Sequence, residues 1–308
     1  MEFRHLSSGQ QTNLILSSDL AKKILLSFDV EHWYLGYKLR GITGWKVDSC
    51  RDYKNIETIL SLLEQYDSKA TFFITGQYAE DYPEIIRSIH DKGHEVASHG
   101  YSHEYIYNQT PEIFSEETIR GKAILSDLIN NEINGYRAAS WSITKDSLWA
   151  LDIISNAGFK YDSSIFPTKN NRYGLYGAPD TPYKVIFQNG TDLLEIPPQT
   201  LKVGPLKLPL CGGVYLRLFP LWINKIAIRK SNSSGVPGRV MLHPHELDSD
   251  PPRLKVNIEA WLVKYYRISK VKSILKNFLA EYRSVTYNEF MREYNTDSFP
   301  RKNLSSFV

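Results

Sequence analysis

The sequence predicts an α/β protein whose parallel strands form either an open sheet or a closed barrel. Short apolar segments of strand type alternate with segments whose apolar residues recur at helical spacing. No internal repeat breaks this order, and no shift in composition divides the 308 residues, so we expect one domain. Several apolar segments end directly at charged or histidine side chains, as expected for catalytic groups at the carboxyl ends of barrel strands.

The composition excludes several classes of function. Apolar residues make up 42% of the chain and charged residues 23%, as in ordinary globular proteins. The formal net charge is only +3, and no basic run carries interleaved aromatic residues, so we expect no nucleic-acid partner. No apolar run approaches the roughly 20 residues of a membrane span. Residues 1–23 contain no signal-peptide core, which predicts a cytoplasmic protein.

The first predicted strand, over residues 22–29, leads to two candidate catalytic acids. Its residues are mostly apolar, which is typical of a strand buried on both faces. Asp29 and Glu31 stand at its end. Because successive strand side chains alternate between faces, these two carboxylates point the same way and Val30 points the opposite way. The spacing therefore favours two acids in one pocket over a pair of solvated loop acids.

The stretch from His94 to His103 carries the candidate metal ligands. A helix is expected over residues 84–93, and a short buried strand then leads to the histidines. His99 and His103 stand four residues apart, which places two imidazoles on one face of a helical turn or tight loop. Neutral imidazole is the commonest protein ligand of transition metals, so this pair is a candidate metal site. The spacing alone fits a coincidental pair of surface histidines equally well. His94, at the beginning of the strand, is expected to be structural.

The other predicted elements continue the alternation. Further helices are expected over residues 52–66, 110–130, 144–156 and 256–281, and further strands over 70–75, 136–139, 160–164, 193–197 and 239–246. Residues 287–294 are expected to close the domain. Residues 172–192, rich in Tyr, Gly, Pro and Asn, are expected to form a long loop, and residues 231–238 a flexible linker. The last strand delivers His243 and His245, which share a face.

Segment 214–229 has two interpretations. Its apolar side chains are interspersed with Arg217, Lys225 and Arg229, a pattern that fits a helix lying on a membrane surface. A helix packed on the barrel explains the same apolar content, and we favour it. On the first interpretation the protein would bind peripherally to the inner face of the membrane.

Together these segments make the chain resemble the polysaccharide deacetylases of the NodB-homology group, carbohydrate esterase family four. All five motifs of that family occur in order between residues 23 and 290. The matching stretches are Phe28–Glu31, Gly93–His103, Gly135–Ala138, Tyr161–Pro167 and His243-Pro244 with Glu246 and Pro252-Arg253. Within the group, Gly212–Arg217 resembles a glycine-rich segment of the subgroup found in exopolysaccharide and O-antigen loci.

The resemblance implies a fold and a domain organisation. The family fold is a distorted, incomplete (β/α) barrel, similar to a TIM barrel but with about seven strands, in a single domain. We expect the deacetylase domain to occupy residues 23–295, after an N-terminal extension over residues 1–22 and before a C-terminal tail over residues 296–308.

The resemblance also implies the catalytic residues. Asp29 matches the catalytic base, and Arg137 matches the arginine that orients the base. His243 matches the general acid. Asp162 matches the aspartate of the fourth motif, and we expect a carboxylate such as this one to keep the acid protonated.

The resemblance assigns His99 and His103 as two metal ligands. Many family members have a second aspartate at the position of Val30, where it binds the metal. We expect Glu31 to replace it, since strand alternation returns Glu31 to the face of Asp29. The expected cofactor is one divalent metal ion, with zinc the first choice and Co²⁺, Mn²⁺, Ni²⁺ and Fe²⁺ as alternatives.

Substrate contacts are expected next to these groups, from Ser140, Trp141, Tyr101, His245 and Trp33. Ala138-Ala139 replaces the family's common Pro-Pro, and we expect an oxyanion donor at the backbone amide near Ser140. His245 is also a rival of His243 for the acid role.

These roles imply a metal-dependent hydrolase that removes an N-acetyl group from an amino sugar in a saccharide or glycan precursor. The expected substrate is an N-acetylated saccharide that is nucleotide-linked, lipid-linked or oligomeric. Two alternatives stay open at this point. One is a related amidohydrolase acting on a formamide or a cyclic amide, and the other is an inactive carbohydrate-binding homologue.

Overall fold

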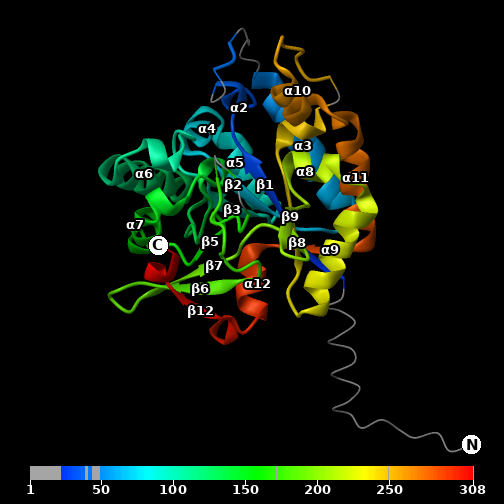
Figure 1. The fold of residues 1–308 in the computed structure, drawn as a ribbon. Helices are drawn as coiled ribbons and strands as arrows, with labels where there is room; N and C mark the ends of the chain where they lie inside the picture. Colours follow the sequence, from blue (N-terminus) through cyan, green and yellow to red (C-terminus); the bar gives the residue numbers. More distant parts are fainter. Residues whose placement is uncertain are drawn as a thin grey trace, which may run out of the picture.

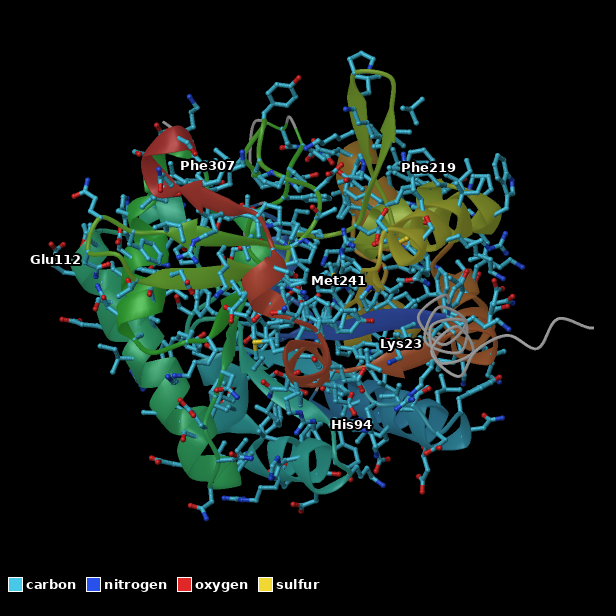
Figure 2. The ribbon with its side chains drawn as sticks, turned by 90° about the horizontal axis from the view of Figure 1, so that it is seen from below. Lys23, His94, Glu112, Phe219, Met241 and Phe307 are labelled. Carbon is cyan, nitrogen blue, oxygen red and sulfur yellow. The ribbon has the colours of Figure 1, made fainter. Side chains whose placement is uncertain are left out.

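Strand β1 (Lys23–Val30) lies at the centre of the protein (Figure 1). The structure, a computed structural model, describes residues 22–38, 41–43, 49–168, 170, 173–248 and 250–307. After Lys23, every residue of β1 is buried. The strand pairs in parallel with β2 on one side and with β10 on the other. Figure 2 shows Met241 of β10 beside β1, in agreement with its register opposite Ser27.

The predicted incomplete (β/α) barrel of about seven strands is confirmed. Its parallel strands follow the order β10-β1-β2-β3-β4-β5-β7. The bounds after β1 are β2 Thr71–Ile74, β3 Glu95–Ser98, β4 Gly135–Tyr136, β5 Tyr161–Asp162, β7 Asp192–Glu195 and β10 Gly238–Leu242. Five further strands of the described residues extend the sheet or form a separate hairpin: β6 Tyr183–Ile186, β8 Thr200–Val203, β9 Leu206–Pro209, β11 Arg283–Val285 and β12 Arg301–Asn303.

Helices cover the sheet on both sides, with α6 and α7 at one edge of Figure 1 and α9 to α11 at the other. Their bounds are α2 Leu35–Lys38, α3 Ser49–Gln65, α4 Gly76–Asp81, α5 Pro83–Asp91, α6 Pro111–Ile129, α7 Trp149–Asn156, α8 Gly213–Leu218, α9 Leu221–Ser233, α10 Ile258–Tyr265, α11 Val271–Glu281 and α12 Tyr287–Glu293. The sequence dictates the ends of α6. The Thr110 side chain caps it ahead of Pro111, and Asn130 ends it in the left-handed conformation. Among the described helices, none has the length and apolar content to cross a membrane.

The second half of the chain differs from the sequence prediction in several places. The predicted helix over residues 256–281 is two helices, α10 and α11, with Arg267 in the left-handed conformation between them. The expected loop over residues 172–192 contains β6, which pairs antiparallel with β7. Segment 214–229 forms two helices, because Pro220 forces the preceding residue out of the helical region. The expected linker over residues 231–238 begins inside α9. The expected C-terminal tail contains β12 (Arg301–Asn303), which pairs with β6 and so extends the sheet. The expected N-terminal extension lies outside the described residues, apart from Lys22.

No strand ladder joins β7 to β10 in the described part of the barrel; an isolated backbone bridge between Gly212 and Met241 and the side chain of Arg239 close this side. Arg239 of β10 is buried there. Its Nε donates to the carbonyl oxygen of Pro197 at 3.1 Å and its Nη2 to that of Asp180 at 2.8 Å. Its Nη1 donates to Ser231 Oγ at 2.6 Å, and its backbone amide donates to Gln199 Oε1 at 3.1 Å. Burial lowers the pKa of Arg239 to about 10, so this guanidinium remains charged at neutral pH.

We expect Arg239→Met to destabilise the fold by about 3 kcal/mol or more. The substitution would leave two buried carbonyl groups without donors, and each such group costs about 1 to 3 kcal/mol. Thermal unfolding of the purified chain would measure the loss. Arg229→Met is the matched control, because this arginine is exposed on α9 and pairs with Glu281 at the surface, where an ion pair contributes at most about 1 kcal/mol. Equal melting temperatures for the two variants would show that Arg239 does not close the barrel.

Candidate active site and metal centre

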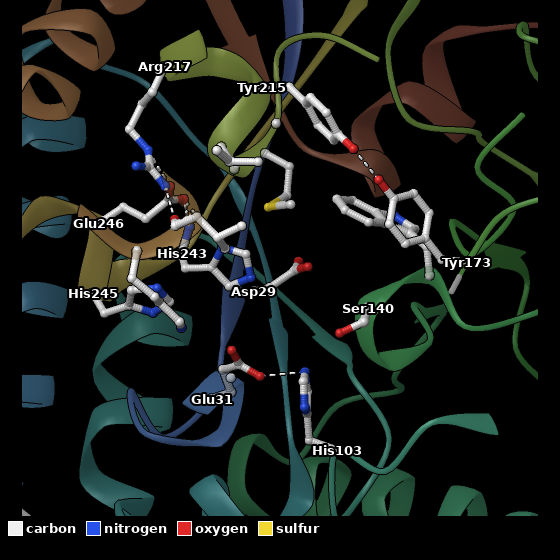
Figure 3. A pocket seen from close by; sticks show the side chains of 18 of the residues that line it. Asp29, Glu31, His103, Ser140, Tyr173, Tyr215, Arg217, His243, His245 and Glu246 are labelled. Atoms are coloured by element: carbon white, nitrogen blue, oxygen red, sulfur yellow. Dashed lines mark hydrogen bonds and ion pairs between the residues drawn. The ribbon is translucent and has the colours of Figure 1, made fainter. Parts of the chain in front are cut away.

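A cavity of about 550 Å³ opens at the carboxyl ends of the strands (Figure 3). β1 supplies Asp29 and, just beyond its end, Glu31. The loop after β3 supplies His103. The turn after β10 supplies His243 and His245. The parallel sheet therefore brings five of the sequence-predicted residues into one cavity.

A buried arginine holds the candidate base. Arg137 follows β4, and its Nη1 lies 2.5 Å from Asp29 Oδ1. The same guanidinium donates to Ser27 Oγ, at 3.0 Å, and to the Tyr287 hydroxyl, at 2.9 Å. It also lies over the Phe73 ring, 3.9 Å from the centroid. These contacts fix one carboxylate oxygen of Asp29 and leave the other for chemistry, as the expected orienting role requires.

Glu31, His99 and His103 form a cluster with the donor atoms of a metal site. One donor atom from each residue lies within 4.8 Å of the others, and all three residues are buried. His99 Nδ1 lies 2.8 Å from the carbonyl oxygen of Arg137. As a donor to that oxygen, Nδ1 carries the proton and Nε2 keeps a free lone pair. Glu31 Oε2 and His103 Nε2 are in direct contact.

The charge states of this cluster suit a divalent cation. Burial is the main reason that the pKa of His99 falls to about 4, so its imidazole is neutral at pH 7. Burial alone would raise the pKa of Glu31, but the charges of His103, His243 and His99 bring it well below its usual value. His103 Nδ1 has no hydrogen-bond partner among the described residues. Two imidazoles and a carboxylate match catalytic zinc sites, which keep a further position for water or substrate.

The backbone is strained where it delivers this cluster. His103 has a φ of 59°, and Ser140 and Trp141, on the opposite wall, both have a φ of 52°. Side chains other than glycine rarely occupy this left-handed region, and such strain gathers at functional sites. Ser140 and Trp141 line the cavity as predicted.

His243 contacts Glu246, not Asp162. Its Nδ1 lies 3.3 Å from Glu246 Oε2, and its backbone amide donates to the same oxygen at 2.9 Å. Burial alone would lower the pKa of His243, but the hydrogen bond and charge of Glu246 raise it above its ordinary value. The expectation that Asp162 keeps the acid protonated is therefore corrected.

Asp162 instead pairs with a second buried carboxyl group. It lies beside Glu195 of the neighbouring strand β7 and accepts a hydrogen bond from Ser164 Oγ at 2.5 Å. Burial and the charge of Asp162 raise the pKa of Glu195 well above its usual value, so Glu195 is the protonated partner. Ser164 Oγ also accepts a hydrogen bond from the Ala138 amide at 2.8 Å. Asp162 thus supports the loop that follows Arg137.

The two histidines after β10 have opposite electrostatic environments. Their rings lie 5.0 Å apart between centroids. Burial, and then the charge of Lys264, bring the pKa of His245 well below its ordinary value. His245 is therefore neutral at pH 7, and His243 is the better proton donor. His245 remains a cavity-lining residue.

Two of the predicted substrate-contacting residues lie outside the cavity lining. Trp33 is buried in a separate apolar cluster with Tyr265. Tyr101 donates to Glu80 Oε2 at 2.8 Å, and the Arg120 guanidinium lies over its ring. Both tryptophan and tyrosine follow predicted strands in the sequence, but the loops turn them away from the metal cluster.

The sequence analysis assigned no role to four residues that complete the cavity. Arg217 and Glu246 stand behind His243, and Tyr173 and Tyr215 form part of the aromatic wall with Trp141. In Figure 3 the two tyrosine hydroxyl groups contact each other on the side of the cavity opposite His245. Glu246 and Arg217 both lie inside segments that match the family motifs. The signal that could have identified them is that a buried charge needs a partner of opposite charge.

The fold and the site define a (β/α)-barrel protein with three buried side chains that could hold a metal ion, beside a carboxylate and a histidine. Comparison with known proteins narrows this class. Residues 21–161 match the polysaccharide deacetylase family, and residues 163–292 match a domain of unknown function, DUF3473. These matches, with the curated relatives below, support a polysaccharide deacetylase domain of the NodB-homology group in this chain.

Curated relatives include a peptidoglycan deacetylase from Helicobacter pylori, 28% identical over 58% of this chain and 66% of its own length. A peptidoglycan-N-acetylglucosamine deacetylase from Bacillus cereus is 34% identical over 47% of this chain and 54% of its own length. The chain therefore spans between half and two thirds of these two relatives.

Among solved structures, the fold is similar to a polysaccharide deacetylase from Mycobacterium smegmatis, described as putative in its published name. The TM-score is 0.60, with 18% identity over 92% of this chain and 94% of the other. It is also similar to PuuE allantoinase, with a TM-score of 0.58 and 16% identity over 90% of this chain and 92% of that one. At these identities the likeness concerns the fold alone.

We expect the chain to bind one zinc ion per molecule and His103→Ala to weaken that binding by at least 10-fold. The substitution removes one of the three expected ligands. It also removes the imidazole whose Nε2 contacts Glu31 Oε2. Zinc content after dialysis, measured by elemental analysis, tests this. His90→Ala, on α5, is the control and should keep the zinc. Equal zinc affinity in the His103→Ala protein and the parent would contradict the assigned ligand set.

Proposed function

We propose that this chain is a metal-dependent hydrolase that removes the N-acetyl group from an amino sugar. The observation that carries this proposal is the convergence of three groups in one cavity. They are a carboxylate held by arginine, a cluster of three metal ligands and a histidine held by a carboxylate. Each of them serves the hydrolysis of an amide, because the carbonyl is a poor electrophile and the amine a poor leaving group.

Asp29, Glu31, His99 and His103 would prepare the attack on the acetamide carbon. Glu31, His99 and His103 would hold a divalent metal, which would supply a water of lowered pKa, from about 15.7 towards about 7, and would polarise the carbonyl group. Asp29 accepts the proton of the attacking water at Oδ2, since Oδ1 is held by Arg137. The backbone amide near Ser140 donates to the developing oxyanion, and loss of one such donor typically costs about 3 to 4 kcal/mol.

His243 would complete the reaction by giving a proton to the departing amine. Its raised pKa keeps more of it protonated at neutral pH than an unperturbed histidine would be. The proton goes to the sugar nitrogen as the carbon–nitrogen bond breaks. The products are acetate and a free amino sugar.

The substrate that we propose is an N-acetylated saccharide in which a sugar ring stacks on Trp141 and the neighbouring tyrosines. The cavity volume lies within the range of about 300 to 1,000 Å³ that is usual for small-molecule sites. Aromatic side chains such as Trp141, Tyr173 and Tyr215 give large apolar contact with polar edges, which suits a sugar ring. The names of the curated relatives, which refer to peptidoglycan, agree with an N-acetylated hexosamine.

We also propose that the saccharide is lipid-linked and that the protein works at the inner face of the membrane, as in exopolysaccharide or O-antigen assembly. Leu218, Trp222 and Ile226 follow one another at four-residue spacing across α8 and α9, and all three are exposed, Trp222 to 63%. Lys225 and Arg229 lie on the same segment, but both pair with Glu281, so the exposed apolar side chains carry this proposal. Leu216 and Ile228 are buried, so the segment also packs on the barrel.

We expect Asp29→Asn to lower acetate release by about 100-fold or more, since it removes the general base and retains the shape. In the assay, zinc-loaded protein is incubated with N-acetylated sugars of three kinds: oligomers, nucleotide sugars and lipid-linked saccharides. Asp127→Asn, exposed on α6, is the matched control and should be as active as the parent.

Other outcomes of this assay decide against the proposal. An Asp29→Asn protein as active as the parent would exclude the mechanism. Hydrolysis of a formamide or a cyclic amide, with no acetate from any sugar, would assign the site to a related amidohydrolase. Saturable saccharide binding with no turnover of any amide would identify an inactive carbohydrate-binding protein.

We expect the triple substitution of Leu218, Trp222 and Ile226 by serine to reduce co-sedimentation with vesicles of anionic phospholipid several-fold. It removes exposed apolar area that would enter the head-group region. The control replaces Ile113 and Ile119, exposed on α6, by serine and should leave co-sedimentation unchanged. Equal sedimentation of the triple variant and the parent would show that Leu218, Trp222 and Ile226 do not contribute to membrane binding.

A further inference from the structure

A buried pair of opposite charges stands directly behind His243, and neither member touches the metal cluster. Arg217 of α8 and Glu246 of the turn after β10 are each 2% exposed. We propose that Glu246 and Arg217 are positioning residues that hold His243 in its proton-donating orientation and charge state, in place of Asp162. This inference rests on the proposed function for the role of His243, and on geometry alone for the identity of its partners.

Each oxygen of Glu246 has a separate task. Oε2 faces His243, with the backbone amide at 2.9 Å and Nδ1 at 3.3 Å. Oε1 faces Arg217, with Nε at 3.1 Å and Nη2 at 3.0 Å. A carboxylate that faces Nδ1 keeps the proton there, and the opposite nitrogen, Nε2, is then left to exchange a proton with the reacting amine. Figure 3 shows the imidazole between Glu246 and Asp29.

Arg217 fixes Glu246 from the other side and ties it to the cavity wall. Its Nη1 donates to the carbonyl oxygen of Tyr266 and its Nη2 to that of Val263, both at 2.6 Å. Both carbonyl groups belong to the end of α10, whose residues Glu259, Val263 and Lys264 line the cavity. A planar guanidinium satisfies a carboxylate and two carbonyl groups at once, which a lysine ammonium at the end of a flexible chain does less well.

The surroundings of His243 make Glu246 the carboxylate that controls it. The titratable and charged groups that face it or stand behind its neighbours are Asp29, Glu31, His103, His245, Glu246, Arg217 and Lys264. Asp29 is neutralised by Arg137, and Glu31 belongs to the metal cluster. Burial alone would raise the pKa of Glu246, but Arg217 and His243 bring it well below its usual value, so Glu246 is ionised at neutral pH.

Asp162 has no such contact, because its oxygens are already engaged. Oδ1 accepts from Ser164 Oγ at 2.5 Å, and Oδ2 accepts from the Ser164 amide at 3.3 Å. Glu195 supplies the proton that this pair of carboxyl groups shares. If Glu246 is the partner of His243, its substitution shifts the pKa of His243 and substitution of Asp162 does not. The opposite result is expected if Asp162 is the partner.

The test is the titration of His243 in the full, zinc-loaded chain, followed by ¹⁵N NMR of the imidazole nitrogens. The chain has 8 histidines, and the signals that disappear in a His243→Gln sample identify this one. We expect Glu246→Gln to lower the pKa of His243 by about one unit or more, since it removes the neighbouring negative charge and keeps the size of the side chain. We expect Asp162→Asn and the surface control Glu281→Gln to leave it in place.

The pH dependence of acetate release gives a second readout. His243 must be protonated to act as the acid, so kcat/KM falls as the pH rises through its pKa. In Glu246→Gln this alkaline limb should move to lower pH together with the NMR titration. Arg217→Lys keeps the positive charge and loses the fork, so kcat should fall about 10-fold with the limb unmoved.

The two readouts separate this inference from the proposed function. A His243 titration that does not move in Glu246→Gln, or that moves as far in Asp162→Asn, would overturn the inference whatever the enzyme does. If the His243 titration moves in Glu246→Gln but the parent releases acetate from no substrate, the pairing of His243 with Glu246 is supported and the deacetylase role is excluded. If Glu246→Gln fails to fold, the parent itself decides, since a His243 that titrates below the ordinary histidine value would refute the assigned partner.

Discussion

The buried guanidinium of Arg137 is the group on which the rest of the site depends. Its side chain joins Asp29 and Ser27 of β1 to Ser163 after β5 and to Tyr287 of α12. Its backbone oxygen accepts from His99 and so sets the nitrogen that faces the metal cluster. The proposed base, Asp29, and the proposed metal ligand, His99, are therefore both held by one residue at the end of β4. Breaking such a buried charge pair by removing one partner typically costs about 3 to 5 kcal/mol, so the site and the barrel are stabilised together.

The two halves of the chain contribute different parts of the chemistry. The half that matches the polysaccharide deacetylase family supplies Asp29, Arg137 and the three ligand residues. The half that matches the domain of unknown function supplies His243, Glu246 and Arg217. Neither half contains a complete acid–base set, and the cavity lies where they meet. The second half also bridges the open side of the barrel through Arg239, so it completes the fold as well as the site.

Sequence patterns predicted the parts of this protein that depend on local order. The apolar β1, the alternation that turns Asp29 and Glu31 to one face, and the ends of α6 all follow from neighbouring residues. The contacts of Asp162 did not follow, because its partner Glu195 is a cross-strand neighbour that no local pattern identifies. The contacts of Arg217 did not follow for the same reason: its burial depends on Glu246 and on the end of α10, both distant in sequence. In this segment, only the exposed side chains of Leu218, Trp222 and Ile226 still support the membrane interpretation.

Environment, not residue type, distinguishes the two histidines after β10. They are two residues apart on one short turn. Burial alone would lower the pKa of each imidazole. Glu246, held ionised by Arg217, restores the charge of His243. Lys264 acts in the opposite direction on His245. A separation of charge states between neighbouring titratable groups is the arrangement by which sites assign a proton donor at neutral pH. Since Arg217 is bonded to the end of α10 and Lys264 lies on α10, the position of that one helix sets both charge states at once.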